Sequence, residues 1–336
     1  IVRTQEGITF CYTFLFTDYF YCMERLMIKD VSGKVGEQVL VKAWVDVRRD
    51  QGKMVFLDLR DMTGKVQAVV LPNHTEALEV AQKVRPEWVL AVTAQVNKRP
   101  EKNIKVGVIG GDVELEVLSI EVLNEATTPA FDISTDGYEV GEEVRLQHKY
   151  LDQRRARIQR NIRMRHKVIN HIRNYFDGHG FTEVDTPLLT NPTPEGSRSY
   201  LVPSRVHSGT FYALPQSPQQ YKQLLMAGGL ERYFQIAKCM RDEDTRGDRQ
   251  PEFTQMDLEM SFVTREDVMK INEDLLIEIV TKLFPEKRIQ QVPFPRFTYK
   301  EVMEKYNSDK PDIREDKNDP NLLAFCWVID FPAFEK

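Results

Sequence analysis

Polar side chains that could bind a charged ligand alternate along a predicted strand over residues 252–262. Phe253, Gln255, Asp257 and Glu259 share one face with Ser261, because successive side chains of a strand point to opposite sides. The other face carries Thr254, Met256, Leu258, Met260 and Phe262. A face with an aromatic ring, an amide and carboxylates, inside otherwise apolar sequence, is either an exposed surface or the floor of a binding site.

A preceding strand predicts the second half of this floor. One side of that strand carries Gln235, Ala237, Cys239, Arg241 and Glu243. The guanidinium of Arg241 suits a pair of anionic oxygens, since its fork of donors can bind both at once. A very polar loop, residues 244–251, joins the two strands. Two antiparallel strands with these faces predict a site for a charged ligand.

A lysine on a predicted helix adds a second cation to these candidates. Gln219 and Lys222 are three residues apart where a helix is expected to start, so they lie on one helix face. Lys222 taken alone is compatible with an ordinary surface lysine. The surrounding Gln-Ser-Pro-Gln sequence, residues 216–219, favours a binding role.

Short alternating strands fill residues 38–123, ahead of these candidates. Val39, Val41, Ala43, Val45 and Val47 point to one side of the first strand. The next strand would bury Val55, Leu57 and Leu59 and place Phe56, Asp58 and Arg60 opposite. Three further strands, near 66–70, 88–96 and 113–123, and a helix over 74–85 complete the pattern. Five strands with one intervening helix predict a small barrel of the OB type.

The region that follows predicts a linker and then mixed helices and strands. Residues 126–145 contain Pro129, Gly137 and Gly141 and are expected to be a linker. A helical pattern then runs from 145 to 178 and ends at a glycine-containing C-cap. Residues 265–284 predict another helix, which Thr264 and Asp267 would cap in an imperfect capping box.

Composition excludes several classes of protein. The 336 residues are 41% hydrophobic and 29% charged, which is ordinary for a globular protein of two or three domains. The four cysteines show neither metal-ligand spacing nor a disulfide pattern, and no apolar stretch is long enough to span a membrane. We therefore expect a cytoplasmic protein with reduced thiols.

The net charge of −5 does not by itself indicate nucleic-acid binding, but its distribution is uneven. Residues 145–173 contain ten Lys or Arg and a single acid, Asp152. Such a stretch is either a local phosphate-binding surface or, as is commoner for a charge run, a solvated helix face.

Five sequence blocks in one order resemble the bacterial-type aspartyl-tRNA synthetases, which are class II aminoacyl-tRNA synthetases. The blocks are residues 181–187 (motif 1), 194–198, 200–205, 214–223, and 240–243 with 251–257 (motif 2). The resemblance extends from about Met23 to the end of the chain. Ser199 departs from it, because the family usually has Asp at this position.

This resemblance implies a fold and a set of domains. The expected class is α+β: a five-stranded OB-fold anticodon-binding barrel over residues 23–125, the linker, and a class II catalytic domain over 146–336. That domain would be an antiparallel sheet flanked by helices. Residues 1–22 are expected to be a non-native leader, since Met23 begins family-like sequence. Motif 3, late metal ligands, a second aspartate-binding Arg and the usual insertion domain are not found, so an incomplete and weakly active catalytic domain is expected.

The resemblance also implies ligands and roles. Aspartate would be bound by Glu195, Ser217, Gln219, Lys222, Arg241, Gln255 and Asp257, with Lys222 on the side-chain carboxylate. Lys222 and Arg241 would thus share one cationic pocket, next to the nucleotide. ATP, with Mg²⁺, would be bound by Arg241, Asp242, Glu243, Gln250 and Phe253, and Arg241 would also be the catalytic residue. Arg49, Phe56 and Gln67 would contact the anticodon, with Phe56 stacked on a base. No metal ligand is assigned within the chain.

The implied partners are L-aspartate, tRNA(Asp), possibly tRNA(Asn), and a second copy of the chain in a homodimer. Two alternatives remain. An asparaginyl or lysyl enzyme shares the architecture, although Gln219 with Lys222 favours a carboxylate substrate. A non-catalytic tRNA-binding protein would keep the barrel, although Arg241, Glu243 and Phe253 are intact. Phe56 itself is also compatible with an ordinary surface aromatic.

Overall fold

The computed structural model describes residues 3–4, 7–8, 23–247 and 249–334. The chain divides into two compact units between Gln159 and Arg160. The expected leader over residues 1–22 lies outside the described residues, except for the short paired strands β1 (Arg3–Thr4) and β2 (Gly7–Ile8).

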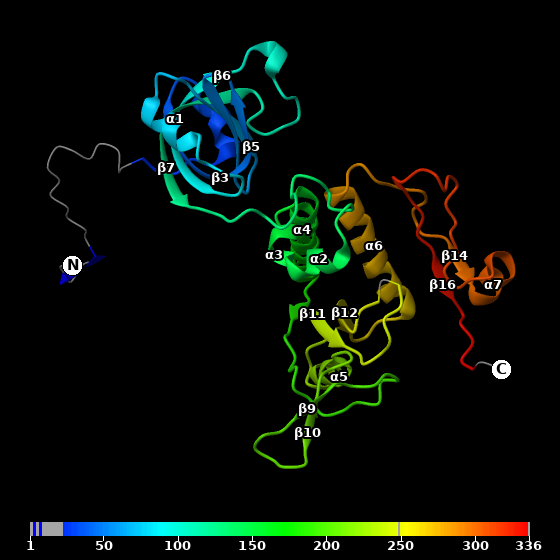
Figure 1. Cartoon of the computed structure of the whole chain (residues 1–336). Coiled ribbons are helices and arrows are strands. Elements are labelled where there is room, and N and C mark those ends of the chain that lie inside the picture. Colours follow the sequence, from blue (N-terminus) through cyan, green and yellow to red (C-terminus); the bar gives the residue numbers. More distant parts are fainter. Residues whose placement is uncertain (1–2, 5–6, 9–22, 248, 335–336) are drawn as a thin grey trace. The chain divides into compact units, whose positions relative to one another are not determined.

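The first unit contains a closed five-stranded barrel (Figure 1). Its strands are β3 (Gln38–Gln51), β4 (Met54–Arg60), β5 (Lys65–Val70), β6 (Val89–Lys98) and β7 (Val113–Asn124), in the order β3-β4-β5-β7-β6. Helix α1 (Thr75–Ala81) follows β5, and two 3₁₀ helices are η1 (Ile28–Lys34) and η2 (Glu101–Asn103). The predicted OB-type barrel is confirmed, with a helix that ends at Ala81 rather than near residue 85.

Alternation of side chains fills the barrel interior, as the sequence predicts. Val39, Val41 and Val45 are at most 5% exposed, and they pack with the apolar residues of the other strands. Val47 was expected to join them, but it is only half-buried. A β-bulge between Val45 and Val47 interrupts the pairing of β3 with β4 and shifts the alternation by one residue.

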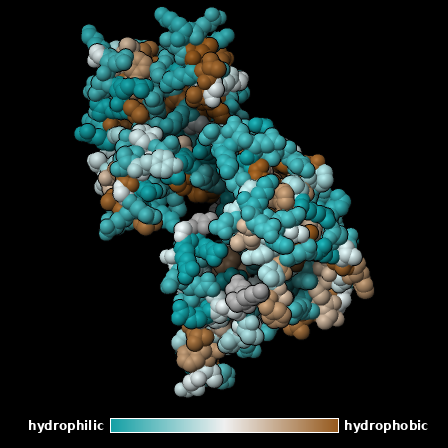
Figure 2. Space-filling model, turned by 90° about the vertical axis from the view of Figure 1, so that its right-hand side faces the viewer, coloured by the Kyte–Doolittle hydropathy of each residue, from teal (hydrophilic) through white to brown (hydrophobic). Residues whose placement is uncertain are grey.

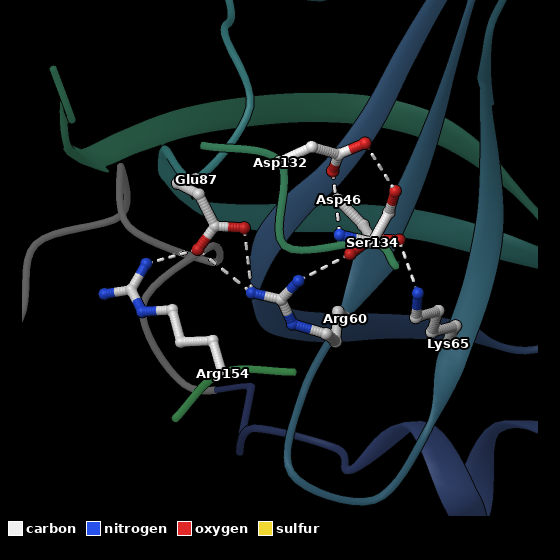
Figure 3. Close-up of polar contacts among 7 residues, drawn as sticks. All are labelled: Asp46, Arg60, Lys65, Glu87, Asp132, Ser134 and Arg154. Atoms are coloured by element: carbon white, nitrogen blue, oxygen red, sulfur yellow. Dashed lines mark hydrogen bonds and ion pairs between the residues drawn. The ribbon is translucent and has the colours of Figure 1, made fainter. Parts of the chain in front are cut away.

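An ion-pair network lies on the barrel in the first unit (Figure 3). Arg60 of β4 donates to Asp46 of β3 at 2.5 Å and to both oxygens of Glu87 at 2.9 and 3.0 Å. Arg154, which follows the linker, also donates to Glu87, and Lys65 donates to Asp46 at 2.6 Å. The carboxylates of Asp46 and Glu87 are almost fully buried. The ion pair of Arg154 with Glu87 therefore holds the segment after the linker against the barrel.

The helix predicted over 145–178 is three helices. They are α2 (Glu142–Gln147), α3 (Lys149–Asp152) and α4 (Ala156–Gly178). The break before α4 accommodates Arg155, which is fully buried, donates to Asp152 at 2.8 Å and to the carbonyl of Thr135 at 2.9 Å. Gly137 has a φ of +82°, and a Cβ there would meet the Arg155 guanidinium at 2.6 Å. The linker is therefore packed around one arginine, and Arg155 belongs to no phosphate-binding surface.

The second unit is built on a three-stranded sheet in the order β12-β11-β8 (Figure 1). The strands of the whole second unit are β8 (Thr182–Glu183), β9 (Leu201–Pro203), β10 (Phe211–Ala213), β11 (Arg232–Met240), β12 (Glu252–Met260), β13 (Arg288–Ile289), β14 (Arg296–Thr298), β15 (Leu322–Leu323) and β16 (Trp327–Ile329). Its helices after α4 are α5 (Gln219–Ala227), α6 (Arg265–Leu283) and α7 (Tyr299–Tyr306).

One face of this sheet forms the core of the second unit. Ile236, Met256, Leu258 and Met260 pack against α4 and α6, around buried Phe176. The strand predicted over 252–262 ends at Met260, so Phe262 leaves the apolar face; its φ is +59° and it is 94% exposed. The capping box at Thr264 is complete: Asp267 occupies the position where Glu is usual, and its side chain accepts from the backbone N–H of Thr264.

No helix among the described residues is both long and apolar enough to cross a bilayer. The face drawn in Figure 2 is mainly hydrophilic, and its hydrophobic side chains form separate patches. Of the four cysteines, Cys239 and Cys326 lie in the described part of the chain, and both are free thiols.

Candidate functional site

Strands β11 and β12 place the predicted polar residues on one face, opposite the apolar core. Gln235 is paired with Asp257 across the two strands, and Cys239 is paired with Phe253. Since directly opposite residues of an antiparallel pair point to the same side, these side chains form a common floor. The predicted floor, with Gln255 between Phe253 and Asp257, is therefore confirmed.

Lys222 lies at one end of this floor. It is in the first turn of α5, its ammonium donates to Asp257 at 2.9 Å, and it lies 3.3 Å from Glu259. The side chains of Lys222 and Asp257 are each 10% exposed. Burial alone would lower the pKa of Lys222, but Asp257 and Glu259 outweigh burial and raise it. Burial also raises the pKa of Asp257, in spite of the lysine beside it.

Glu195 and Ser217 lie together next to Lys222's helix. The hydroxyl of Ser217 donates to one oxygen of Glu195 at 2.5 Å, and Thr193 donates to the other at 2.7 Å. Gln219 is the first residue of α5 and is half-buried. A carboxylate held by two hydroxyls, near a buried lysine, provides opposite charges for a zwitterionic ligand.

Charged side chains from several segments lie around Cys239 on the floor. Cys239 is fully buried, and burial raises its pKa to about 11. Arg241 opposes that shift, whereas Asp257 and Glu195 add to it, so all three lie within electrostatic reach of the thiol. Since Arg241 is nearest the end of β11, the floor has a cation towards each end, Lys222 and Arg241.

Arg241 and Phe253 form the second half of the floor. The guanidinium of Arg241 lies over the Phe253 ring, 5.2 Å from its centre, and its Nε is buried without a hydrogen-bond partner among the described residues. A stacked arginine with an unused donor is suited to an anion, and the ring beside it is suited to a flat aromatic ligand.

A cavity of about 990 Å³ opens at this end of the floor. Its lining includes all of the predicted nucleotide residues: Arg241, Asp242, Glu243, Gln250 and Phe253. Lys222 does not line this cavity. The single cationic pocket that Lys222 and Arg241 were expected to share is therefore two neighbouring subsites on one sheet face. Phe253, next to Arg241, and Asp257, next to Lys222, are four positions apart along β12, which is about 13 Å.

Several residues at the cavity were not predicted from the sequence. Arg198, Arg246, Arg249 and Lys310 add four cations to its lining. Gln216, only 1% exposed, binds both the N–H and the carbonyl of Ser197 through its amide. A charge count over the loop between β11 and β12 would have indicated the two loop arginines. Nothing in the sequence indicated Lys310, which is distant along the chain.

The loop that carries Ser197 also contacts a predicted nucleotide residue. Ser197 donates to Glu243 at 2.6 Å, and the Asp242 N–H donates to the carbonyl of Arg198 at 3.0 Å. Ser199, the departure from the family pattern, accepts a hydrogen bond from the amide of Gln216 at 3.0 Å. Serine therefore fits this position through Gln216, without a carboxylate.

The barrel brings its three predicted contact residues to one outer face. Arg49 is directly opposite Phe56 across β3 and β4, and Gln67 is opposite Asp58 across β4 and β5. Without the bulge in β3, the odd-numbered Arg49 would share the inward side of Val45. Arg49 donates to Asp58 at 2.9 Å. The bulge thus decides that Arg49 accompanies Phe56.

More polar groups lie on this barrel face than were predicted. Gln67 donates to Glu114 at 2.6 Å, and Asn97 donates to Glu116 at 3.0 Å. His74 is 3.4 Å from Glu116. Alternation in β7, where Val113, Leu115 and Val117 are buried, could have indicated these outward carboxylates.

The described residues offer no ready-made metal site. No group of three or more His, Cys, Asp or Glu side chains in them is placed to hold a metal ion.

Comparisons with known proteins match two separate parts of the chain. Residues 39–123 match the family model of the OB-fold nucleic acid binding domain, and residues 141–336 match that of the class II tRNA synthetases (D, K and N). The chain is 48% identical over 307 residues to an aspartate–tRNA(Asp/Asn) ligase of Bacillus subtilis, covering 91% of this chain and 52% of that protein. It is 49% identical over 303 residues to an aspartate–tRNA ligase of Staphylococcus aureus, covering 90% and 51%.

A solved structure shares the architecture. The asparaginyl-tRNA synthetase of Pyrococcus horikoshii, complexed with asparaginyl-adenylate, is 25% identical with a TM-score of 0.72, over 87% of this chain and 68% of that one. The chain spans about half the length of the curated relatives it matches. With a family model over more than half of its residues, and with that family's motif 1 and motif 2 residues on one sheet, the chain belongs to the class II tRNA synthetases of the D, K and N group.

Proposed function

We propose that this chain provides the anticodon-binding barrel and the aspartate- and ATP-binding floor of an aspartate–tRNA ligase. The observation that carries the proposal is the buried ammonium of Lys222, held by Asp257 on the same floor as Arg241 and Phe253. A buried ammonium favours a carboxylate side chain over an amide, because a hydrogen bond between two charged groups is stronger than one to a neutral amide. The curated relatives, named aspartate ligases, support this choice over an asparaginyl enzyme.

The proposed reaction has two steps and needs no nucleophile from the protein. The α-carboxylate of aspartate attacks the α-phosphate of ATP, and pyrophosphate leaves to give aspartyl-adenylate. The terminal ribose hydroxyl of the tRNA then attacks the acyl carbon, and AMP leaves. Arg241 would neutralise charge on the reacting carboxylate and phosphate, and Phe253 would orient the adenine. Glu243 would bind the adenine amino group after releasing Ser197, and Gln250 would cover the nucleotide.

The amino-acid side of the site follows from the charges on the floor. Lys222 and Asp257 would fix the substrate side chain, whereas Glu195, with Ser217, would accept the substrate ammonium. Gln219 and Gln255 would complete the hydrogen bonds of the bound amino acid. Mg²⁺ would arrive with the phosphates of ATP, since that ion commonly keeps few protein ligands.

On the barrel, we propose that Phe56 stacks on an anticodon base, with Arg49 and Gln67 beside it, and that the tRNA is tRNA(Asp). The Bacillus subtilis relative, named for tRNA(Asp/Asn), makes tRNA(Asn) a second candidate. A homodimer is supported by an apolar groove of about 430 Å³ beside α4, lined by Met164, Val168, Ile172, Ile236 and Met256 among others.

Calorimetry with non-hydrolysable aminoacyl-adenylate analogues tests the proposal on this chain. We expect the aspartyl analogue to bind at least about tenfold more tightly than the asparaginyl analogue, which is about 1.4 kcal/mol. Aspartate-dependent exchange of pyrophosphate into ATP gives an independent readout. Equal affinity for the two analogues, or a preference for the asparaginyl one, would overturn the assignment.

A further inference from the structure

Two further buried polar side chains lie on the amino-acid side of the floor. Tyr233 and Gln235 of β11 are 0% and 5% exposed. The side chain of Gln235 contacts the Tyr233 hydroxyl at 2.7 Å and the hydroxyl of Thr186, just after β8, at 3.0 Å. Neither Tyr233 nor Gln235 has a role in the proposed chemistry so far.

Donors and acceptors around Gln235 decide which end of its amide faces Tyr233. That end also lies 3.2 Å from the carbonyl oxygen of Val184, and the other end lies 3.3 Å from the backbone N–H of Thr186. A carbonyl oxygen needs a donor, and an N–H needs an acceptor. The amide nitrogen therefore faces Val184 and Tyr233, and the amide oxygen accepts from Thr186.

This orientation leaves the Tyr233 hydroxyl hydrogen free for another acceptor. The carboxylate of Asp257 provides one, since its Oδ2 is buried and has no hydrogen-bond partner among the described residues. Its other oxygen, Oδ1, is the one that holds Lys222. Tyr233 and Asp257 are diagonal neighbours on one face of the two strands, because Tyr233 is opposite Glu259 and Gln235 is opposite Asp257. Burial raises the pKa of Tyr233, and Asp257 raises it further.

We propose that Tyr233 and Gln235 are positioning residues for amino-acid selection. Gln235, anchored to Thr186, donates to the Tyr233 oxygen; the Tyr233 O–H donates to Asp257 Oδ2; and Asp257 Oδ1 holds the Lys222 ammonium. A carboxylate bound on both oxygens cannot rotate away, so Lys222 stays aimed at the substrate side chain. Only the statement that Lys222 is aimed at the substrate side chain rests on the proposed function.

The hydrogen bonds can be tested without any ligand. NMR of the full chain with labelled glutamine should show contacts from the Gln235 amide hydrogens to the Tyr233 ring rather than to the Thr186 N–H. A ¹³C titration of the Asp257 carboxyl should give a higher pKa in Tyr233→Phe than in wild type, because a donor to the carboxylate is lost. The other charged or titratable groups around Asp257 are Lys222, Glu259 and Cys239, and the variant leaves them unchanged.

Binding of free amino acids tests the selection step. Tyr233→Phe should weaken L-aspartate binding by about tenfold, the usual effect of losing a hydrogen bond to a charged group, and L-asparagine binding by less than about twofold. Tyr212→Phe is the matched control, because Tyr212 on β10 is 40% exposed and lies outside the network. It should leave both affinities and the Asp257 pKa unchanged.

The outcomes separate the two ideas. Contacts of the amide hydrogens to the Thr186 N–H, or an unchanged Asp257 pKa in Tyr233→Phe, would overturn the hydrogen-bond chain. An equal loss of binding affinity for aspartate and for asparagine in Tyr233→Phe would mean that Tyr233 has only a structural role. If both NMR results hold but wild type does not prefer aspartate, the proposed function fails and the hydrogen-bond chain stands.

Discussion

Arg49 with Asp58 on the barrel, and Lys222 with Asp257 in the second unit, are ion pairs of the same length, 2.9 Å. Their surroundings differ. The barrel side chains are 42% and 16% exposed, whereas both side chains of the second pair are 10% exposed. An exposed pair contributes little because water competes for both charges, but breaking a buried pair leaves a charge without solvent or partner. Distance alone therefore does not tell which pair matters.

The same contrast extends to how ligands would be bound. Polar groups of the barrel face lie on adjacent strands and remain accessible, so an incoming base can replace their contacts at little cost. Lys222, by contrast, is held by a carboxylate that the floor itself positions. We infer that the barrel adapts to its ligand, whereas the floor is preorganised for one.

Replacing the buried lysine should have the largest effect. Lys222→Met leaves Asp257 without its partner, so the second unit should lose about 3–5 kcal/mol of unfolding free energy. Aspartate binding should also be lost. Urea unfolding monitored by hydrogen exchange would locate the loss, and protection within the barrel should be unchanged. A loss below about 1 kcal/mol would mean that the pair is worth no more than a surface pair.

Substitution of Phe56 on the barrel should change RNA binding more than it changes stability. Phe56→Leu should weaken binding of an anticodon stem-loop by about 1–3 kcal/mol, since a stacked base loses its platform. Phe56→Tyr keeps the ring and serves as the control, with affinity close to wild type. Fluorescence anisotropy with labelled RNA measures both. Similar affinities for the two variants would show that Phe56 only covers the strand beside it.

Acid should weaken the barrel through Asp61. Burial alone would raise the pKa of Asp61, but hydrogen bonds from Ile28, Thr63 and Gly64 outweigh burial and lower it. A lowered folded pKa means that the stabilisation is full above the unfolded value of 3.8 and is lost as the pH falls through the folded value. Asp61→Asn should cost about 1.5 kcal/mol near neutral pH.

Urea unfolding of wild type and Asp61→Asn at neutral pH and at about pH 2.5 would check this. The difference between the two proteins should shrink at the lower pH, because that pH lies below the unfolded value of 3.8 and the stabilisation by the charged carboxylate is being lost there. A constant difference would show that geometry, not charge, holds the turn.

A helix cap in the second unit should be worth less. Thr264→Ala removes one half of the capping box of α6 and should cost about 1 kcal/mol. Thr281→Ala, on the exposed side of the same helix, should cost less than about 0.5 kcal/mol. Thermal unfolding of both variants gives the comparison, and equal costs would contradict the capping role.

The smallest expected effect is on the exposed ion pair. Arg49→Met should change the unfolding free energy by less than about 0.5 kcal/mol, since its side chain is 42% exposed. The same variant should weaken binding of the anticodon stem-loop measurably. An Arg49→Met protein as unstable as Lys222→Met would remove the distinction between the two pairs.

The sequence determined the periodic features of both units. Period-two alternation identified the five barrel strands and the polar face of β12, because a strand with one buried face must alternate. Local chemistry identified the Thr264 cap, since Asp267 is its neighbour both in sequence and in space. The roles of the site residues on the floor came from the resemblance of their sequence blocks to a known family.

The tertiary structure decided the rest. The bulge in β3 moved Arg49 to the outer face and Val47 out of the core, and buried Arg155 occupies the break before α4 in a segment predicted as one helix. Lys310 reached the cavity, and Tyr233 came to lie beside Asp257, through contacts between segments distant along the chain. Such contacts depend on which strands pair and in which register, and a single strand's pattern of side chains does not contain that information.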